Sequence, residues 1–183
     1  MIDEKILEEL NQQVQEENYS GYIYLAMAAW LEEEGYKGMA NWMRVQAREE
    51  KIHADIFYNY ILERGGHVKL QAIEAPPDKW KTPLELFKAA LEHEEHITSR
   101  INHMVDVSLN VKDHATYQML QWFVEEQVEE EANVGEAVQQ LSIVGEEGRG
   151  ILMVDREMST RVFSVPASAP WYPKSGQPGS MAA

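Results

Sequence analysis

The sequence contains four long stretches of helical periodicity, and a polar residue interrupts the apolar stripe near the middle of each. In the second stretch the stripe passes through Glu50 and His53, which are neighbours on one helix face because they are three residues apart. The other interruptions are Glu17 in the first stretch, Glu94 in the third, and Gln127 with Glu130 in the fourth. These side chains should therefore point into the core, where a carboxylate needs a partner.

The interruptions recur at a matched spacing. Glu17 and Glu50 are 33 residues apart, and so are Glu94 and Gln127. In each pair the second member is followed three residues later by a further ligand type, a histidine or a glutamate. The alternative is that all four stripes are misphased and the acids lie on the surface, where glutamate is usually found. Matched spacing in four stretches disfavours it, so the two halves read as copies of one helical hairpin.

The connections between the stretches predict the architecture. Helices are expected over residues 4–33 and 38–64, then from Pro83 to a break at 110–113, and from there to about Gly145, with a shorter helix from about Glu146 to Arg161. Thr82 is the expected N-cap of the third helix, with Pro83 at its first position. The connections between helices 1 and 2 and between helices 3 and 4 are short, and the connection between helices 2 and 3 is long. They predict an all-α four-helix bundle with a long crossover between helices 2 and 3, plus a short fifth helix.

Composition narrows the class of protein. With 183 residues the chain should form one domain, over 1–163, followed by a Pro/Gly/Ser-rich tail at 164–183 that is expected to be disordered and could be partly a cloning remnant. The absence of cysteine excludes disulfides and thiolate chemistry. A net charge of −15 argues against nucleic acid as a partner. No apolar run is long enough for a membrane span and the start of the chain lacks a signal-peptide pattern, so a cytoplasmic location is expected.

Converging carboxylates predict a metal centre. Several carboxylates in a core of low dielectric cannot all stay ionised unaided, and a pair of divalent ions would neutralise them. Oxygen ligands with one nitrogen and no sulfur favour iron or manganese over copper, and fit structural zinc poorly. Glu50, between the two halves of the site, is the natural bridging carboxylate.

On these residues the chain resembles the prokaryotic non-haem ferritins over roughly 1–163. The resemblance rests on the acidic positions, the Glu50-x-x-His53 and Gln127-x-x-Glu130 pairs, the hairpin spacing and the short fifth helix. The run from Trp122 to Glu131 is also similar to the family's.

The resemblance implies roles for particular residues. Two iron ions per subunit are expected, the first held by Glu17, Glu50 and His53, and the second by Glu50, Glu94 and Glu130. Gln127 would be a hydrogen-bonding or weak ligand, and Tyr24 would lie near the irons as a possible electron donor; its alternative is an ordinary core tyrosine. A third, looser site would use Glu49, Glu126, Glu129 and Glu130, for which the alternative is a solvated run of charge.

The resemblance also implies a function. The expectation is iron storage and detoxification: iron(II) is oxidised by dioxygen or hydrogen peroxide, and the ferric product is stored as mineral inside a homo-oligomeric shell, commonly of 24 subunits. Lys51 stands where bacterioferritins have a haem-ligating methionine, so no haem is predicted. Two alternatives stay open, a di-iron peroxidase or electron-transfer protein of the same group and a metal-free helical bundle for interactions. The wider ferritin-like di-iron scaffold has Glu-x-x-His on two helices, whereas the fourth helix here has Gln127-x-x-Glu130. The absence of that second histidine argues against the peroxidase.

The remaining histidines are expected to be unrelated to the centre. His93-Glu94-Glu95-His96 resembles a zinc-protease motif, but its histidines are three residues apart instead of four. His67, His103 and His114 are isolated and are predicted to lie on the surface.

Overall fold

The computed structural model describes residues 2–145, 148–165 and 169–170. The helices it contains are α1 (Glu4–Glu33), α2 (Lys37–Glu63), α3 (Pro83–Asn110), α4 (His114–Val144) and α5 (Gly148–Met158). No described helix has the length and apolar character that crossing a membrane would require.

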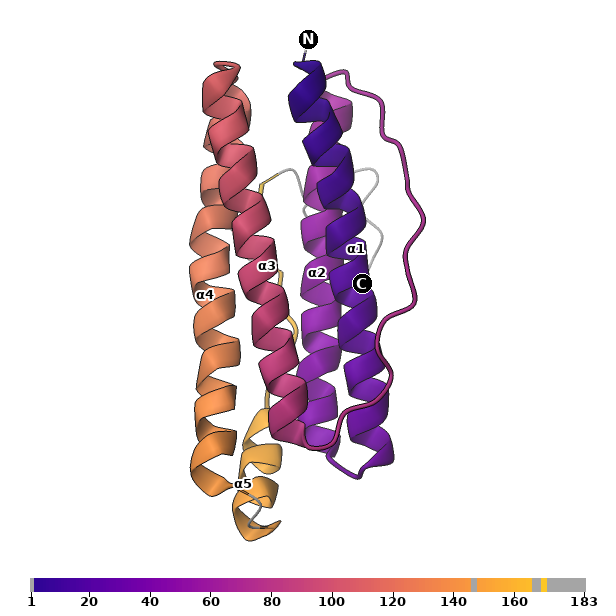
Figure 1. Cartoon of the computed structure of the whole chain (residues 1–183), viewed down its shortest axis with the longest axis vertical. Coiled ribbons are helices and arrows are strands. Elements are labelled where there is room, and N and C mark those ends of the chain that lie inside the picture. Colours follow the sequence, from indigo (N-terminus) through magenta and orange to yellow (C-terminus); the bar gives the residue numbers. More distant parts are fainter. Residues whose placement is uncertain (1, 146–147, 166–168, 171–183) are drawn as a thin grey trace.

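The four long helices form a bundle of two antiparallel hairpins (Figure 1). α1 packs mainly on α2, and α3 packs mainly on α4. The connection over residues 64–82 runs the length of the bundle outside α1, so α2 and α3 run in the same direction. Asn11 of α1 holds this connection, because it donates to the His67 carbonyl at 3.1 Å and accepts from the Lys69 amide at 2.6 Å. The predicted crossover bundle is therefore confirmed.

Local chemistry sets the helix ends where the sequence predicted them. The Thr82 hydroxyl accepts the Glu85 amide at 3.1 Å, and Pro83 begins α3. Gly65 follows α2 with a φ of 72°, a left-handed conformation that glycine adopts without strain. Asp113 caps α4 through the Thr116 amide at 3.1 Å.

α5 is shorter than the sequence predicted. It ends at Met158 instead of Arg161, and the expected first residues, 146–147, lie outside the described part of the chain. The Ser159 and Thr160 hydroxyls donate to carbonyls of the last turn, at 2.6 and 2.8 Å. These side-chain hydrogen bonds compete with the backbone hydrogen bonds that would continue the helix. Asn41 of α2 then binds the Arg161 carbonyl at 3.0 Å. The chain after Met158 is thus held by α2 and leaves the helical path.

Asp155 of α5 caps α2 from a distance in sequence. Its Oδ1 accepts the Gly38 and Met39 amides at 2.8 and 2.9 Å, while Tyr36 at the N-cap position of α2 supplies no side-chain bond. A carboxylate at this position also complements the partial positive charge of a helix N-terminus. Gly38 permits the approach, because a Cβ there would lie 1.6 Å from the Asp155 carbonyl oxygen. This contact fixes α5 against the bundle.

The segment after α5 returns along α2 (Figure 1). The Arg48 guanidinium lies 5.7 Å from the centre of the Phe163 ring, and Ala169 is buried against an apolar cluster near the start of α1. Of the tail predicted to be disordered, residues 166–168 and 171–183 lie outside the described residues. The division into a domain over 1–163 and a tail stays a prediction.

We expect Gly38→Ala to lower the free energy of unfolding by about 1–3 kcal/mol, because the new methyl group displaces α5 and its cap. Gly135→Ala is the matched control. Gly135 lies inside α4 and a Cβ there meets nothing within 4 Å, so this change should stabilise the protein by about 0.5–1 kcal/mol. Thermal and denaturant unfolding of both variants checks the difference. Equal stability of the two would contradict the proposed contact.

Candidate metal centre

A layer of polar side chains crosses the bundle between two apolar clusters. One cluster includes Tyr24, Ala47 and Val134, and the other includes Val14 and Phe123. Between them the following polar side chains are buried: Glu17 on α1, Gln46, Glu50 and His53 on α2, Glu94 on α3, and Gln127 and Glu130 on α4. The sequence prediction that these interruptions face the core is borne out by their burial.

Glu17, Glu50 and His53 form one compact group. Their exposed fractions are 1%, 2% and 3%, and one donor atom from each lies within 4.8 Å of the others. His53 Nδ1 lies 3.4 Å from Glu50 Oε2 and 3.9 Å from Glu17 Oε2. The edges of Trp122 and Phe123 lie against the imidazole, with centroids 5.7 Å away, and orient it. These are the residues predicted to hold the first iron.

Glu94 and Glu130 lie on the other side of the layer and are held by hydrogen bonds. Tyr24 donates to Glu94 Oε1, and Gln127 Nε2 lies 3.3 Å from Glu94 Oε2. Gln46 Nε2 donates to Glu130 Oε2 at 2.8 Å. Each carboxylate therefore has an oriented oxygen, which limits how far it can rotate.

The other predicted ligand sets are less compact. The structure brings His53, Glu126 and Glu130 within the same 4.8 Å limit, but no such group of Glu50, Glu94 and Glu130 occurs among the described residues. In the set for the third site, Glu49 is paired with an arginine and Glu129 is exposed. The assignment of ligands to individual ions thus stays a prediction.

Burial and mutual repulsion make these carboxyls weak acids. Burial first, and then the charge of Glu50, raise the pKa of Glu17 to about 8. Burial and the charge of Glu130 raise the pKa of Glu94 to about 8, and burial with the charges of Glu94 and Glu130 raises the pKa of Glu50 well above its ordinary value. The pKa of Tyr24 is also raised well above its usual range, first by burial and then by the charge of Glu94.

Two of the buried oxygens call for a cation. Within the described residues, Glu17 Oε2 and Glu50 Oε1 are buried and have no hydrogen-bond partner. Such atoms are costly unless a ligand satisfies them. They belong to the compact group whose third member offers an imidazole nitrogen. This donor set suits divalent iron or manganese and fits the predicted centre.

Sequence reasoning missed the residues that support the ligands. Gln13 donates to Glu17 Oε1 at 2.8 Å, and Arg100 donates to Gln13 Oε1 at 3.2 Å. Gln46 performs the same task for Glu130. Gln13 and Gln46 are completely buried, and an amide on an apolar stripe one turn before a ligand was the available signal. Arg161, which contacts Gln46, gave no such signal because it lies beyond α5.

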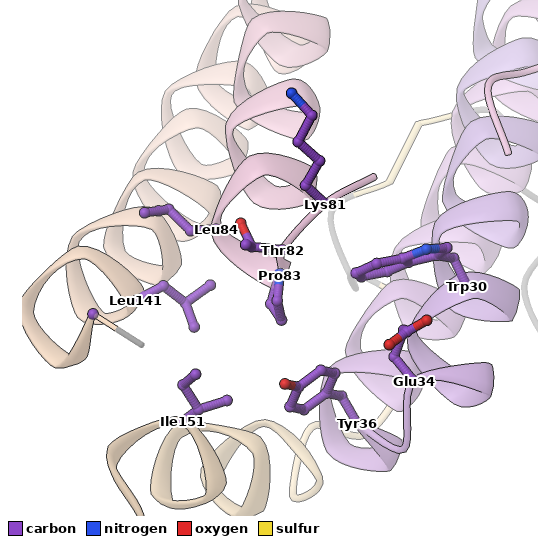
Figure 2. Close-up of a pocket in the computed structure, with 10 residues that line it drawn as sticks. Trp30, Glu34, Tyr36, Lys81, Thr82, Pro83, Leu84, Leu141 and Ile151 are labelled. Atoms are coloured by element: carbon purple, nitrogen blue, oxygen red, sulfur yellow. The ribbon is translucent and has the colours of Figure 1, made fainter. Parts of the chain in front are cut away.

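A separate pocket of about 280 Å³ lies at the α5 end of the bundle (Figure 2). It is bounded by Trp30 and Tyr36 at the α1–α2 turn, Pro83 at the start of α3, Leu141 of α4 and Ile151 of α5. Its lining includes none of the buried carboxylates of the polar layer. We therefore assign it no part in the metal centre.

The remaining histidines lie outside the polar layer. His93 Nε2 is 2.7 Å from the Ser20 hydroxyl, and burial lowers the pKa of His93 to about 4. His67, His103 and His114 are exposed, as the sequence predicted.

A bundle of this topology with a buried layer of carboxylates and histidine defines the class of helical metal-storage and di-metal proteins. Residues 7–144 match the Ferritin-like domain family. The chain is 37% identical over 163 residues to a bacterial non-heme ferritin of Staphylococcus aureus (strain MRSA252), covering 89% of this chain and 98% of the relative. It is 39% identical over 161 residues to the bacterial non-heme ferritin of Bacteroides fragilis (strain 638R), covering 88% of this chain and all of the relative.

Solved structures agree. An open pore ferritin from the hyperthermophilic archaeon Archaeoglobus fulgidus matches with a TM-score of 0.88 and 47% identity, over 88% of this chain and 100% of that one. A closed form of the same archaeal ferritin, engineered by site-directed mutagenesis, matches with a TM-score of 0.88 and 46% identity, over 90% and 100%. The chain belongs to the ferritin family and is a prokaryotic non-haem ferritin. Its function is iron storage.

The metal-free protein should lose stability as the pH rises from about 4.5 to about 8. In this window the unfolded chain releases protons that folded Glu17 and Glu94 retain, since burial and neighbouring charge raise their pKa values to about 8. The folded state binds more protons, so the free energy of unfolding falls with rising pH. A divalent ion reverses the trend because it binds the ionised carboxylates more strongly. Thermal unfolding midpoints between pH 5 and 8, with and without metal, measure both effects.

Glu17→Gln should flatten this pH dependence in the metal-free protein. Glu33→Gln is the matched control, since Glu33 is exposed near the end of the same helix. An unchanged slope in Glu17→Gln would mean that Glu17 is not a buried acid.

Proposed function

We propose that this ferritin oxidises iron(II) at the buried centre before storing it. The observation that supports the proposal most directly is the pair of buried carboxylate oxygens, on Glu17 and Glu50, that lack a partner beside the His53 imidazole. A site built only for packing would not leave them uncompensated. Two iron(II) ions entering as substrates would supply the missing positive charge.

The chain offers one carboxylate and an imidazole to the first ion, two carboxylates to the second, and one carboxylate between them. Glu17 and His53 would bind the first ion, Glu94 and Glu130 the second, and Glu50 would bridge them. Gln127, already 3.3 Å from Glu94 Oε2, would contribute a weak contact. Two ions held together can give up one electron each in a single encounter with an oxidant.

The electron balance is simple for either oxidant. Two iron(II) ions become two iron(III) ions, and dioxygen takes the two electrons with two protons and leaves as hydrogen peroxide. With hydrogen peroxide as oxidant, the same two electrons and two protons break the O–O bond and give two waters. Tyr24, which donates a hydrogen bond to Glu94, would have the role that the resemblance implies, an electron donor beside the irons.

The ferric product would pass to mineral inside a shell of 24 copies. The looser third site that the resemblance implies, at Glu49, Glu126, Glu129 and Glu130, stays a prediction. Exposed apolar side chains support assembly. Tyr22 and Leu25 on α1 are about half exposed, at 52% and 51%, and Leu152 and Met153 on α5 are exposed at 51% and 71%. Apolar surface of this kind is typical of contacts between subunits. The inference that Lys51 precludes haem binding and the cytoplasmic location stay predictions.

Aerobic addition of iron(II) tests the oxidation site. Glu50→Ala removes the bridging carboxylate, and we expect the initial rate of iron(III) formation to fall by about 10-fold or more. Glu125→Ala is the matched control, because Glu125 is an exposed glutamate on α4. Oxidation by Glu50→Ala as fast as by the control would refute the site.

Particle mass and iron retention test storage. A shell of 24 chains of 21.0 kDa has a mass of roughly 500 kDa, and loaded particles should sediment with far more than two iron atoms per chain. Turnover of hydrogen peroxide without retained iron would instead support the di-iron peroxidase. Protein from iron-replete cells that contains no metal would support a plain interaction bundle.

A further inference from the structure

Arg161 is the residue after α5 that reaches the metal centre. One guanidinium nitrogen, Nη2, lies 2.6 Å from Glu49 Oε2 and also donates to Gln46 Oε1. The guanidinium stacks on Trp42, with its carbon 4.3 Å from the ring centre. A cation therefore lies against the edge of the centre, and it is part of the chain.

Main-chain contacts tether this cation. Asn41 Nδ2 donates to the Arg161 carbonyl at 3.0 Å, and Asp155, earlier in the chain on α5, accepts from the first amides of α2. Trp42 and Asn41 belong to the same helix as Gln46 and Glu49. Asn41 thus holds the main chain of Arg161 against α2, and Trp42 holds the plane of its guanidinium.

Arg161 determines how the Gln46 amide is oriented. A guanidinium has no acceptor, so the amide oxygen of Gln46 must face it. The amide nitrogen then faces Glu130 and donates to its Oε2 at 2.8 Å. Because Gln46 is completely buried, its amide relies on these two protein partners. Arg161 therefore acts through Gln46 to orient the carboxylate of Glu130.

Arg161 also competes for Glu49. Glu49 belongs to the set expected to hold a third ion, yet the group that the structure brings together contains His53, Glu126 and Glu130 without it. An ion that used Glu49 would have to displace a charge-assisted bond and a stacked guanidinium.

We propose that Arg161 is a tethered cation that withholds Glu49 from a third metal ion and positions Glu130, through Gln46, for the second. The proposal rests on the proposed function, because it presumes a pair of ions at the buried centre. The third site then binds its ion weakly because Arg161 occupies Glu49. The affinity for a third ion is therefore set by Arg161, a positioning residue beyond α5.

Calorimetric titration of the assembled, metal-free protein with zinc(II), a redox-inert divalent ion, tests the proposal. We expect wild type to bind two ions tightly and a third weakly. Arg161→Gln removes the charge and should strengthen the third binding step by at least about 10-fold, because Glu49 becomes available. Arg156→Gln is the matched control, with the same charge change at an exposed position of α5. Arg161→Lys keeps a cation and should keep the third step weak.

A double variant shows whether the effect passes through Glu49. Adding Glu49→Gln to Arg161→Gln should return the third step to its wild-type strength. A third step equally strong in Arg161→Gln and Arg156→Gln, or a gain that survives Glu49→Gln, would overturn the proposal while the two tight ions still support the proposed function. Failure of wild type to bind two ions tightly would overturn both.

Discussion

The cost of burying carboxylates between two apolar clusters governs this structure. Glu17, Glu50 and Glu94 are almost completely removed from water, and burial raises the pKa of each. Gln13 and Tyr24 offset part of the cost by donating to Glu17 and Glu94. The oxygens left without a partner are the ones that a cation can satisfy. The same desolvation that weakens the metal-free protein thus creates its affinity for divalent ions.

The bundle topology explains how so many ligands meet in one layer. Each hairpin contributes buried acids to the polar layer, and α2 and α3 run in the same direction (Figure 1). The crossover that permits this arrangement is fastened to α1 through Asn11. Outside the bundle, α5 and the segment after it brace α2 through Asp155 and Arg161. The ligands are therefore held by hydrogen bonds inside the bundle, and α2, which carries Glu50 and His53, is also held from outside the bundle by α5 and the segment after it.

Much of the fold and part of the site could be predicted from periodicity alone. Thr82, Gly65 and Gly145 end or begin helices for reasons that lie within a few residues of each. The end of α5 could be predicted only in part, because besides the nearby Ser159 and Thr160 hydroxyls it depends on Asn41, 120 residues away from Arg161. Gln46 lies on a predicted apolar stripe, but its orientation depends on Arg161, which approaches from a different part of the chain.

Local propensity and spacing along one helix face were enough to predict the helices, the crossover, the acidic interruptions and the kinship with ferritins. The folded structure was needed to show which oxygens are hydrogen-bonded, which lack a partner, and that Arg161 pairs with Glu49. Periodicity fixes the face on which a side chain lies. It does not fix the rotamer or the distant group that the side chain meets.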